Sequence, residues 1–317
     1  MKHSLRLMAT ALAVGVTTAA GALAQSAYPS KPIKIVVSAS VAGATDQVAR
    51  ALAQSMSTAL GQTITVENKT GANGVLGAGV VATSAPDGYT ICFCSTFTSP
   101  STTKQTYTVD NVIPVTRAYE LMPMIIVAAD SPYKTLADLV AGAKQKGGAF
   151  GHTGANGVLH LAFEELKHRA GFDMVPVAYQ GETPILPDLI GGRLDAAVVS
   201  TLLAKQQAEN GRVRILAGFG ATSTIQGVPT VAASGYPHLV FSTWGGVFLP
   251  LGTPAPLAKQ VWTAVQAALR DPAVNQRIVN NGLLPILDDT PEQFLEYIRS
   301  SNESLRKTMR NLGLNPV

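Results

Sequence analysis

Four loops rich in glycine and hydroxyl-bearing residues carry the chemistry that this sequence suggests. They are Ser38–Thr45, Ser95–Ser101, His152–Gly157 and Tyr179–Thr183. Loops that lead into helices present unpaired backbone N–H groups, and the helix dipole favours negative charge at that end. Several such loops around one cleft would hold a carboxylate without arginine or lysine. The pattern therefore predicts anion binding rather than catalysis.

A few side chains in these regions have two possible roles. Asp46 would either compensate the helix dipole and pair with Arg50 one turn later, or contact an ammonium or hydroxyl group of a ligand. Tyr179 and Gln180 are interpreted as residues that close over a ligand, the alternative being an ordinary loop surface. Trp244 is expected to pack at a hinge rather than stack on a ligand.

Signatures of enzymes, nucleotide sites and metal sites are weak or missing. The sequence has no Gly-x-Ser-x-Gly elbow, Walker loop or His-Glu-x-x-His motif. Gly77–Ala82 fits a loose dinucleotide fingerprint but lies inside a predicted helix, where its small residues favour close packing. His152, His160 and His168 are eight residues apart, about 12 Å per step on a helix, too far for one metal ion. His160 and Glu164 share a helix face, yet two ligands make no site. We expect neither metal nor cofactor.

The two cysteines, Cys92 and Cys94, alternate on a predicted strand. Residues two apart on a strand lie nearly 7 Å apart, which is poor geometry for a disulfide. We therefore predict two buried thiols.

Strand and helix patterns alternate along the chain and predict an α/β fold with mostly parallel sheets and right-handed crossovers. Thr45–Leu60, for example, repeats apolar residues every four positions and ends at Gly61, a typical C-cap. The predicted strands are Ile33–Val37, Thr63–Glu67, Tyr89–Cys94, Met124–Ala128, Ala149–Gly151, Val175–Ala178, Ala196–Val199, Val213–Ala217 and Phe241–Leu249; the helices are Thr45–Leu60, Gly74–Thr83, Leu136–Lys144, Val158–Arg169, Pro184–Ile190, Pro256–Leu269 and Pro291–Asn311.

The strands and helices form two series without a low-complexity linker between them. We expect two lobes, one made of 25–126 and 240–317 and the other of 127–239, joined by strands that cross between them. Such a hinged molecule would bind its ligand in the cleft between the lobes, outside the carboxyl ends of the strands.

The N-terminus is typical of an exported protein. Lys2 and Arg6 precede the apolar run Leu7–Ala20, and Ala22–Ala24 gives the small-x-small pattern of a cleavage site, so residues 1–24 are predicted to be a signal peptide. The alternative, a membrane anchor, would need a run of about 20 apolar residues. The net charge of +4 is small for 317 residues and argues against a nucleic-acid partner.

Several segments together resemble the Bug/TctC-type solute-binding proteins of tripartite tricarboxylate transporters, and the resemblance covers nearly the whole mature chain. The segments are Tyr28–Ile33, Gly43–Asp46, Val66–Gly74, Ala85–Thr90, Tyr179–Gly181, Asp188–Asp195, Trp244–Gly245 and Pro250–Pro254.

The resemblance implies a periplasmic, monomeric binding protein with a type II-like Venus-flytrap fold, which catalyses nothing and delivers a small carboxylate to a membrane permease. Family members bind dicarboxylates, tricarboxylates, aromatic acids or acidic amino acids, through backbone amides and ordered waters. Carried over, the ligand-binding residues would be Ser38, Ala39, Ser40, Gly43, Ala44, Thr45, Asp46, Thr96, Thr153, Gly154, Ala155, Asn156, Gly157, Tyr179, Gln180, Gly181 and Ser200.

Two departures from the family pattern bear on the ligand. The first loop, Ser38–Gly43, lacks the usual prolines, and the strand after Asp195 ends in Val198-Val199-Ser200 where an acidic residue is usual. The missing acid at Val199 favours a simple or aromatic carboxylate over an amino acid. Two other classes of protein stay open: a sensor subunit that presents its closed form to a signalling partner, and an extracytoplasmic enzyme acting on a small acid.

Overall fold

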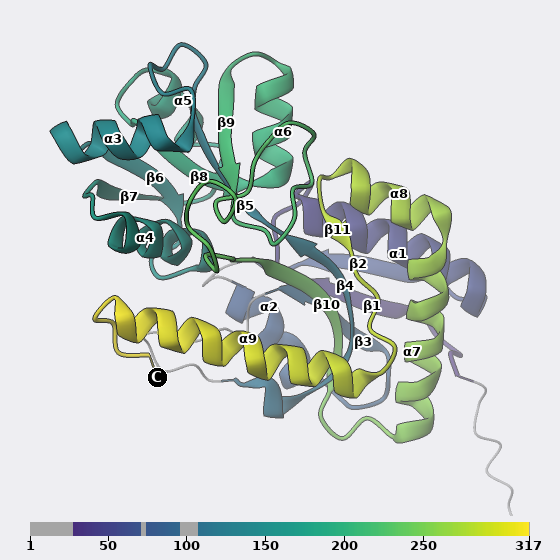
Figure 1. The fold of residues 1–317 in the computed structure, drawn as a ribbon. Coiled ribbons are helices and arrows are strands. Elements are labelled where there is room, and N and C mark those ends of the chain that lie inside the picture. The colour runs from purple at the N-terminus through teal and green to yellow at the C-terminus, as the bar shows by residue number, and fades with distance from the viewer. Residues whose placement is uncertain (1–27, 71–73, 96–106, 317) are drawn as a thin grey trace, which may run out of the picture.

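The computed structural model describes residues 28–70, 74–95 and 107–316, which form two sheets covered by helices (Figure 1). The predicted signal peptide and Thr96 lie outside these ranges. The first sheet has the strand order β11-β4-β10-β3-β1-β2, and the second has the order β7-β6-β8-β5-β9. This arrangement confirms the expected two-lobed α/β fold.

The first sheet uses both ends of the chain. Its elements are β1 (Ile33–Val37), α1 (Ala44–Leu60), β2 (Ile64–Asn68), α2 (Val75–Ala82), β3 (Thr90–Ser95), a 3-10 helix (Val109–Asn111), β4 (Val112–Leu121), β10 (Thr243–Pro250), α7 (Ala255–Arg270), α8 (Pro272–Asn280), β11 (Leu284–Pro285) and α9 (Pro291–Asn311).

The second sheet is built from the middle of the chain. Its elements are β5 (Pro123–Ala128), α3 (Leu136–Lys146), β6 (Ala149–Thr153), α4 (Val158–Ala170), β7 (Val175–Tyr179), α5 (Ile185–Ile190), β8 (Ala196–Ser200), α6 (Thr201–Glu209) and β9 (Val213–Gly218). Every predicted strand and helix is present in the two lobes, with ends within two residues of those expected.

Both sheets are mixed rather than mostly parallel. In the first, β2 and β3 run parallel to β1, whereas β10 is antiparallel to β3 and β4. In the second, β7 and β8 run parallel to β6, whereas β5 is antiparallel to β8 and β9. The antiparallel strands are those next to the points where the chain passes between the lobes, because a strand that enters from the other lobe does not arrive through a right-handed crossover helix.

Two crossings connect the lobes. At the first crossing Met122 separates β4 from β5, and at the second Ser242 precedes β10. The expected boundary at 126/127 falls inside β5, which is hydrogen-bonded to β8 and β9 of the second sheet. We therefore propose that the first lobe ends at Met122.

Helix α9 contributes to the cores of both lobes. Phe294 and Ile298, in its first half, pack with Trp244 and Phe248 of the first lobe. In its second half, Leu305 and Met309 join the core of the second lobe. Figure 1 shows the helix running beneath both lobes, with its end beside α4. The assignment of 240–317 to the first lobe alone thus misses the second role of α9.

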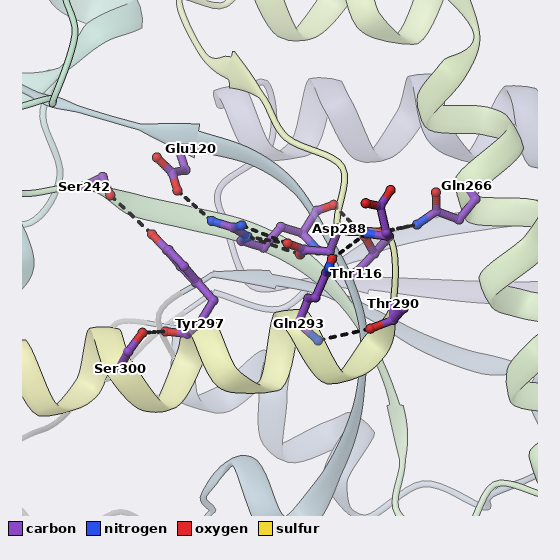
Figure 2. Close-up of polar contacts among 11 residues, drawn as sticks. Thr116, Glu120, Ser242, Gln266, Asp288, Thr290, Gln293, Tyr297 and Ser300 are labelled. Atoms are coloured by element: carbon purple, nitrogen blue, oxygen red, sulfur yellow. Dashed lines mark hydrogen bonds and ion pairs between the residues drawn. The ribbon is translucent and has the colours of Figure 1, made fainter.

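A buried polar network ties α9 to both crossings. The Arg117 guanidinium on β4 forms ion pairs with Asp288 (2.8 Å) and Glu120 (2.7 Å) and lies over the Tyr297 ring, 3.7 Å from its centroid. The Tyr297 hydroxyl on α9 is 3.4 Å from the Ser242 hydroxyl. Figure 2 shows Glu120 and Ser242, one beside each crossing, both near the hydroxyl end of the Tyr297 side chain. The network therefore fixes the helix at the place where a hinge would bend.

The cysteines differ from the prediction of free thiols. Cys92 and Cys94 are buried on β3 and joined by a disulfide. Their Cα atoms are only 5.4 Å apart, inside the range that a disulfide spans, because the strand is less extended here than an ideal one.

Within residues 28–70, 74–95 and 107–316, none of the helices combines the length and the hydropathy needed to span a bilayer.

Gly245 on β10 leaves space for the Tyr119 side chain of the neighbouring strand, since a methyl group there would overlap the Tyr119 ring. We expect Gly245→Ala to lower the free energy of unfolding by about 1–3 kcal/mol through overpacking, measured by urea unfolding. The loss should shrink in a Tyr119→Leu background, where the smaller side chain frees the space. An equal loss in both backgrounds would contradict this account.

Candidate functional site

The first candidate ligand loop connects β1 to α1. Ser38 is buried at the end of β1, and Ser40 is exposed at the tip. Gly43 is the N-cap of α1 but has no side chain to accept the N–H groups of the first turn, at Ala44 and Thr45. Helices α3, α6, α8 and α9 have side-chain caps, whereas α2, α5 and α7, like α1, have none. The start of α1 is thus arranged to receive an external acceptor.

Asp46 organises this loop. Its buried carboxylate accepts hydrogen bonds from the Ala42 backbone N–H (2.9 Å), from Asn68 Nδ2 (2.9 Å) and from Arg50 Nε (3.0 Å). Burial opposes ionisation, but these donors outweigh it and lower the pKa of Asp46 below its usual value. The predicted ion pair with Arg50 is present. With its oxygens held in this way, Asp46 shapes the loop that holds Ala42 in a left-handed conformation (φ 64°).

Thr45 links the loop to the first crossing. Its hydroxyl is 2.6 Å from the buried Tyr119 hydroxyl on β4. Tyr119 is three residues before Met122, where the chain passes to the second lobe. The first loop is therefore anchored next to the crossing.

The second candidate loop, Thr153–Gly157, connects β6 to α4. Gly154 and Asn156 adopt left-handed conformations (φ 64° and 61°), and the Gly157 N–H donates to the Gly154 carbonyl (3.1 Å). The Asn156 N–H donates to His160 Nδ1 (3.1 Å). Gly157 is the N-cap of α4 and, like Gly43, brings no capping side chain. A helix that starts at a glycine without a side-chain cap therefore occurs in both lobes, as α1 and α2 in the first and α4 in the second.

Two histidines lie beneath the second loop. The rings of His152 and His160 are stacked with their centroids 4.1 Å apart, and both lie against Phe150. Burial and the nearby His160 lower the pKa of His152 to about 4. In the described part of the chain, no three His, Cys, Asp or Glu side chains come together as a metal-binding cluster. The stack supports the loop by packing and by the His160–Asn156 hydrogen bond.

The third candidate loop follows β7. The half-buried Tyr179 donates its hydroxyl hydrogen to Asp188, which is also paired with Arg193. Gln180 and Gly181 are exposed, and Gly181 has a φ of 114°. The Tyr179 hydroxyl thus fixes the loop against α5, while the exposed part of the loop is Gln180–Gly181.

Ser200 has a partner that the sequence analysis did not identify. Its N–H donates to Glu182 Oε1 (2.7 Å) and its hydroxyl donates to Glu182 Oε2 (2.6 Å). Ser200 also caps α6 through Leu203. Burial raises the pKa of Glu182, although the two hydrogen bonds from Ser200 act in the opposite direction. The polar atoms of Ser200 are therefore hydrogen-bonded within the protein. The polar group at the end of β8 is the Glu182 carboxylate.

The sheet topology brings the second-lobe candidates together. Thr153, Tyr179 and Ser200 are the last residues of β6, β7 and β8, three adjacent parallel strands, and so lie at one edge of the sheet. Ser200 is also paired with Pro123, directly after the first crossing. From Tyr119, the anchor of Thr45, to Pro123 is four residues, about 13 Å along an extended strand. The loops of the two lobes are thus fixed to the same short stretch of chain.

The pattern of the whole chain matches a known family. The model of the tripartite tricarboxylate transporter family receptor matches residues 48–314. This chain belongs to that receptor family. A protein encoded in the ttuE–ttuC′ intergenic region of Agrobacterium vitis is 34% identical to the receptor in an alignment of 302 residues, which covers 92% of the receptor and 87% of that protein. The protein BugT of Bordetella pertussis is 29% identical to the receptor, in an alignment that covers 97% of the receptor and 98% of BugT.

Solved structures agree with this assignment. A periplasmic transporter is 31% identical to the receptor, with a TM-score of 0.81 over 91% of the receptor and 99% of that chain. A protein of R. palustris with adipate has 26% identity and a TM-score of 0.83, over 92% and 100% of the two chains. MatC of Rhodopseudomonas palustris with bound malate has 25% identity and a TM-score of 0.78, over 89% of the receptor and 99% of MatC. The family and these neighbours are solute-binding proteins of the periplasm.

Several residues of the receptor's family motifs have structural roles. Asp195 Oδ2 accepts the Ala149 N–H (3.0 Å) at the start of β6. Asp87 Oδ1 accepts the Tyr89 N–H (3.0 Å) just before β3. Val199, whose apolar character favoured a simple carboxylate, is fully buried in the second-lobe core. Residue 199 therefore does not determine what the edge of the sheet presents to a ligand.

Proposed function

We propose that this receptor captures a small carboxylate, such as a dicarboxylate, a tricarboxylate or an aromatic acid, between its lobes and delivers it to a membrane permease. In this proposal the chain is exported to the periplasm and loses residues 1–24. The observation that carries the proposal is that α1 and α4, the helices entered from the candidate loops Ser38–Thr45 and Thr153–Gly157, both start at a glycine without a side-chain cap. First-turn N–H groups in that arrangement favour a bound carboxylate.

The two-lobed architecture supports capture by closure. The lobes are joined by two crossings, and ligand contacts from both lobes would stabilise the closed form over the open one. The relatives that hold adipate and malate support a carboxylate as the ligand. In our proposal the ligand lies among Ser38–Asp46, Thr96, Thr153–Gly157 and Tyr179–Gly181, and Ser200 supports the site through Glu182.

A charge introduced at the tip of the first loop tests the proposal. Thermal shifts with a panel of mono-, di- and tricarboxylates and aromatic acids first identify a ligand, since a hundredfold excess over Kd stabilises the native state by about 2.7 kcal/mol. Ser40 is exposed, so Ser40→Asp should fold normally. We expect the negative charge to weaken binding of that ligand at least about tenfold in isothermal titration, because like charges in a binding site repel.

Ser40→Asn is the matched control, nearly identical in shape to aspartate but neutral. It should bind within about threefold of the wild-type protein, a difference of less than 1 kcal/mol. A panel in which no carboxylate raises the melting temperature would overturn the proposed function. Equal affinities of the Asp and Asn variants would show that the carboxylate lies elsewhere.

A further inference from the structure

Glu182 places a carboxylate at the edge of the second sheet where the ligand is expected. It follows the exposed residues Gln180 and Gly181, and its side chain lies at Ser200, the end of β8. Both hydrogen-bond donors of Ser200, the N–H and the hydroxyl, are used by Glu182. At this point the edge therefore offers an acceptor, whereas the starts of α1 and α4 offer donors.

The Glu182 carboxylate retains capacity to accept more hydrogen bonds. Two carboxylate oxygens have about four acceptor positions, and Ser200 fills one on each oxygen. Among the described residues, no lysine, arginine or histidine forms an ion pair with Glu182, and Ser200 is the only group whose interaction shifts its pKa. The side chain is half-buried, so it is partly accessible and partly desolvated. A donor brought by a ligand would satisfy the positions that the protein leaves open.

The position of Glu182 suits the far end of a small ligand. Ser200 is paired with Pro123, and Thr45 of the first loop is anchored to Tyr119, about 13 Å away along the same stretch of chain. A carboxylate held at the start of α1 would leave the opposite end of a short ligand directed toward the second-lobe edge. A second carboxylate there would meet Glu182 with like charge, whereas a hydroxyl or ammonium group would donate to it.

We propose that Glu182 is a specificity-determining residue that selects carboxylates carrying a hydrogen-bond donor, a hydroxyl or an ammonium group, at the end that faces the second lobe. This inference rests on the proposed function and narrows its ligand class to hydroxy- and amino-carboxylates. It replaces the preference for plain carboxylates drawn from Val199, because the acidic group of this edge comes from the loop after β7 and not from β8.

Isothermal titration with ligands that differ only in the donor tests this inference. One series is butyrate, 4-hydroxybutyrate and 4-aminobutyrate, and the other is succinate, malate and aspartate. We expect the wild-type protein to bind at least one donor-bearing member at least tenfold more tightly than the plain member of its series. Glu182→Gln should reduce that preference to less than threefold, because the amide replaces an acceptor oxygen with a donor. Comparing the hydroxyl-bearing and ammonium-bearing ligands of each series shows which donor the protein prefers.

Two controls separate specificity from folding. Glutamine retains partners for the Ser200 N–H and hydroxyl, so the melting temperature of Glu182→Gln should stay within about 2 °C of the wild-type value. Glu209→Gln, an exposed acid on α6 in the same lobe, should keep the wild-type preference. Equal binding of plain and donor-bearing ligands by the wild-type protein, or a preference that persists in Glu182→Gln, would overturn the inference. Either result would leave the proposed function as a carboxylate receptor unaffected. No binding of any carboxylate would instead overturn the proposed function.

Discussion

Replacing Asp288 by alanine is expected to destabilise the protein by about 3–5 kcal/mol, the usual cost of removing one partner of a buried ion pair. Asp288 is 4% exposed and accepts hydrogen bonds from the Arg117 backbone N–H and from its guanidinium. Without that carboxylate, the Arg117 charge stays largely buried and keeps, among the described residues, Glu120 as its anionic partner. For a protein of this size the melting temperature should fall by about 10 °C, as measured by circular dichroism.

The Arg310–Glu303 pair on α9 is the matched control. Its side chains are 54% and 66% exposed, and exposed ion pairs contribute little. Glu303→Ala should therefore change the free energy of unfolding by about 0.5 kcal/mol or less. Adding Arg117→Met to Asp288→Ala should recover part of the loss, because the pair is then removed together with its unpaired charge. Similar losses for Asp288→Ala and Glu303→Ala would contradict the role given to the network.

The second large effect is a loss of stability in mild acid caused by His152. Its pKa is about 4 in the folded protein, whereas a histidine in the unfolded chain titrates near its usual value of 6.5. Between these values the unfolded chain binds a proton that the folded protein excludes, so stability decreases as the pH falls. The contribution is complete above about pH 6.5 and lost near pH 4. It amounts to about 3 kcal/mol across the window, since one pKa unit corresponds to about 1.4 kcal/mol.

Urea unfolding at several pH values between 7 and 4 measures this effect. His152→Gln should have a shallower decline than the wild-type protein, while His168→Gln, which changes an exposed residue on the same lobe, should follow the wild-type curve. Carboxylates such as Asp46 contribute mainly at lower pH, so the difference between the wild type and His152→Gln isolates the histidine. Parallel curves for these two proteins would show that His152 is not the group responsible.

Local pattern predicted most of the elements, because apolar periodicity and glycine caps depend on neighbours in sequence. The elements α6, α8, β11 and β4 were not predicted. In β4 the third residue, Pro114, is unfavourable in a strand. In the structure Pro114 is paired with Phe248 beside a register shift of the ladder, where a missing N–H is tolerated. The double role of α9 was also missed, since its sequence shows an apolar face but not that two different cores cover its two halves.

The candidate loops were predictable and the contacts of their side chains largely were not. Glycines that end strands and enter helices identify Gly43 and Gly157 from sequence alone. The Asp46–Arg50 pair is likewise local, at four residues apart. The Glu182–Ser200 contact joins residues 18 apart, one in the loop after β7 and the other at the end of β8, and the order β7-β6-β8 brings them together. In the sequence, the one indication of this contact was an acidic residue, Glu182, directly after Tyr179–Gly181.

The position of α9 after all the strands of the two sheets bears on how the protein folds. Neither core is complete until residues 294–309 have been synthesised, because the last helix supplies Phe294 and Ile298 to one and Leu305 and Met309 to the other. The first sheet also waits for β10, which lies between β3 and β4. Both cores therefore depend on a helix that is synthesised after every strand of the two sheets, and we expect each lobe to remain incomplete until α9 is available.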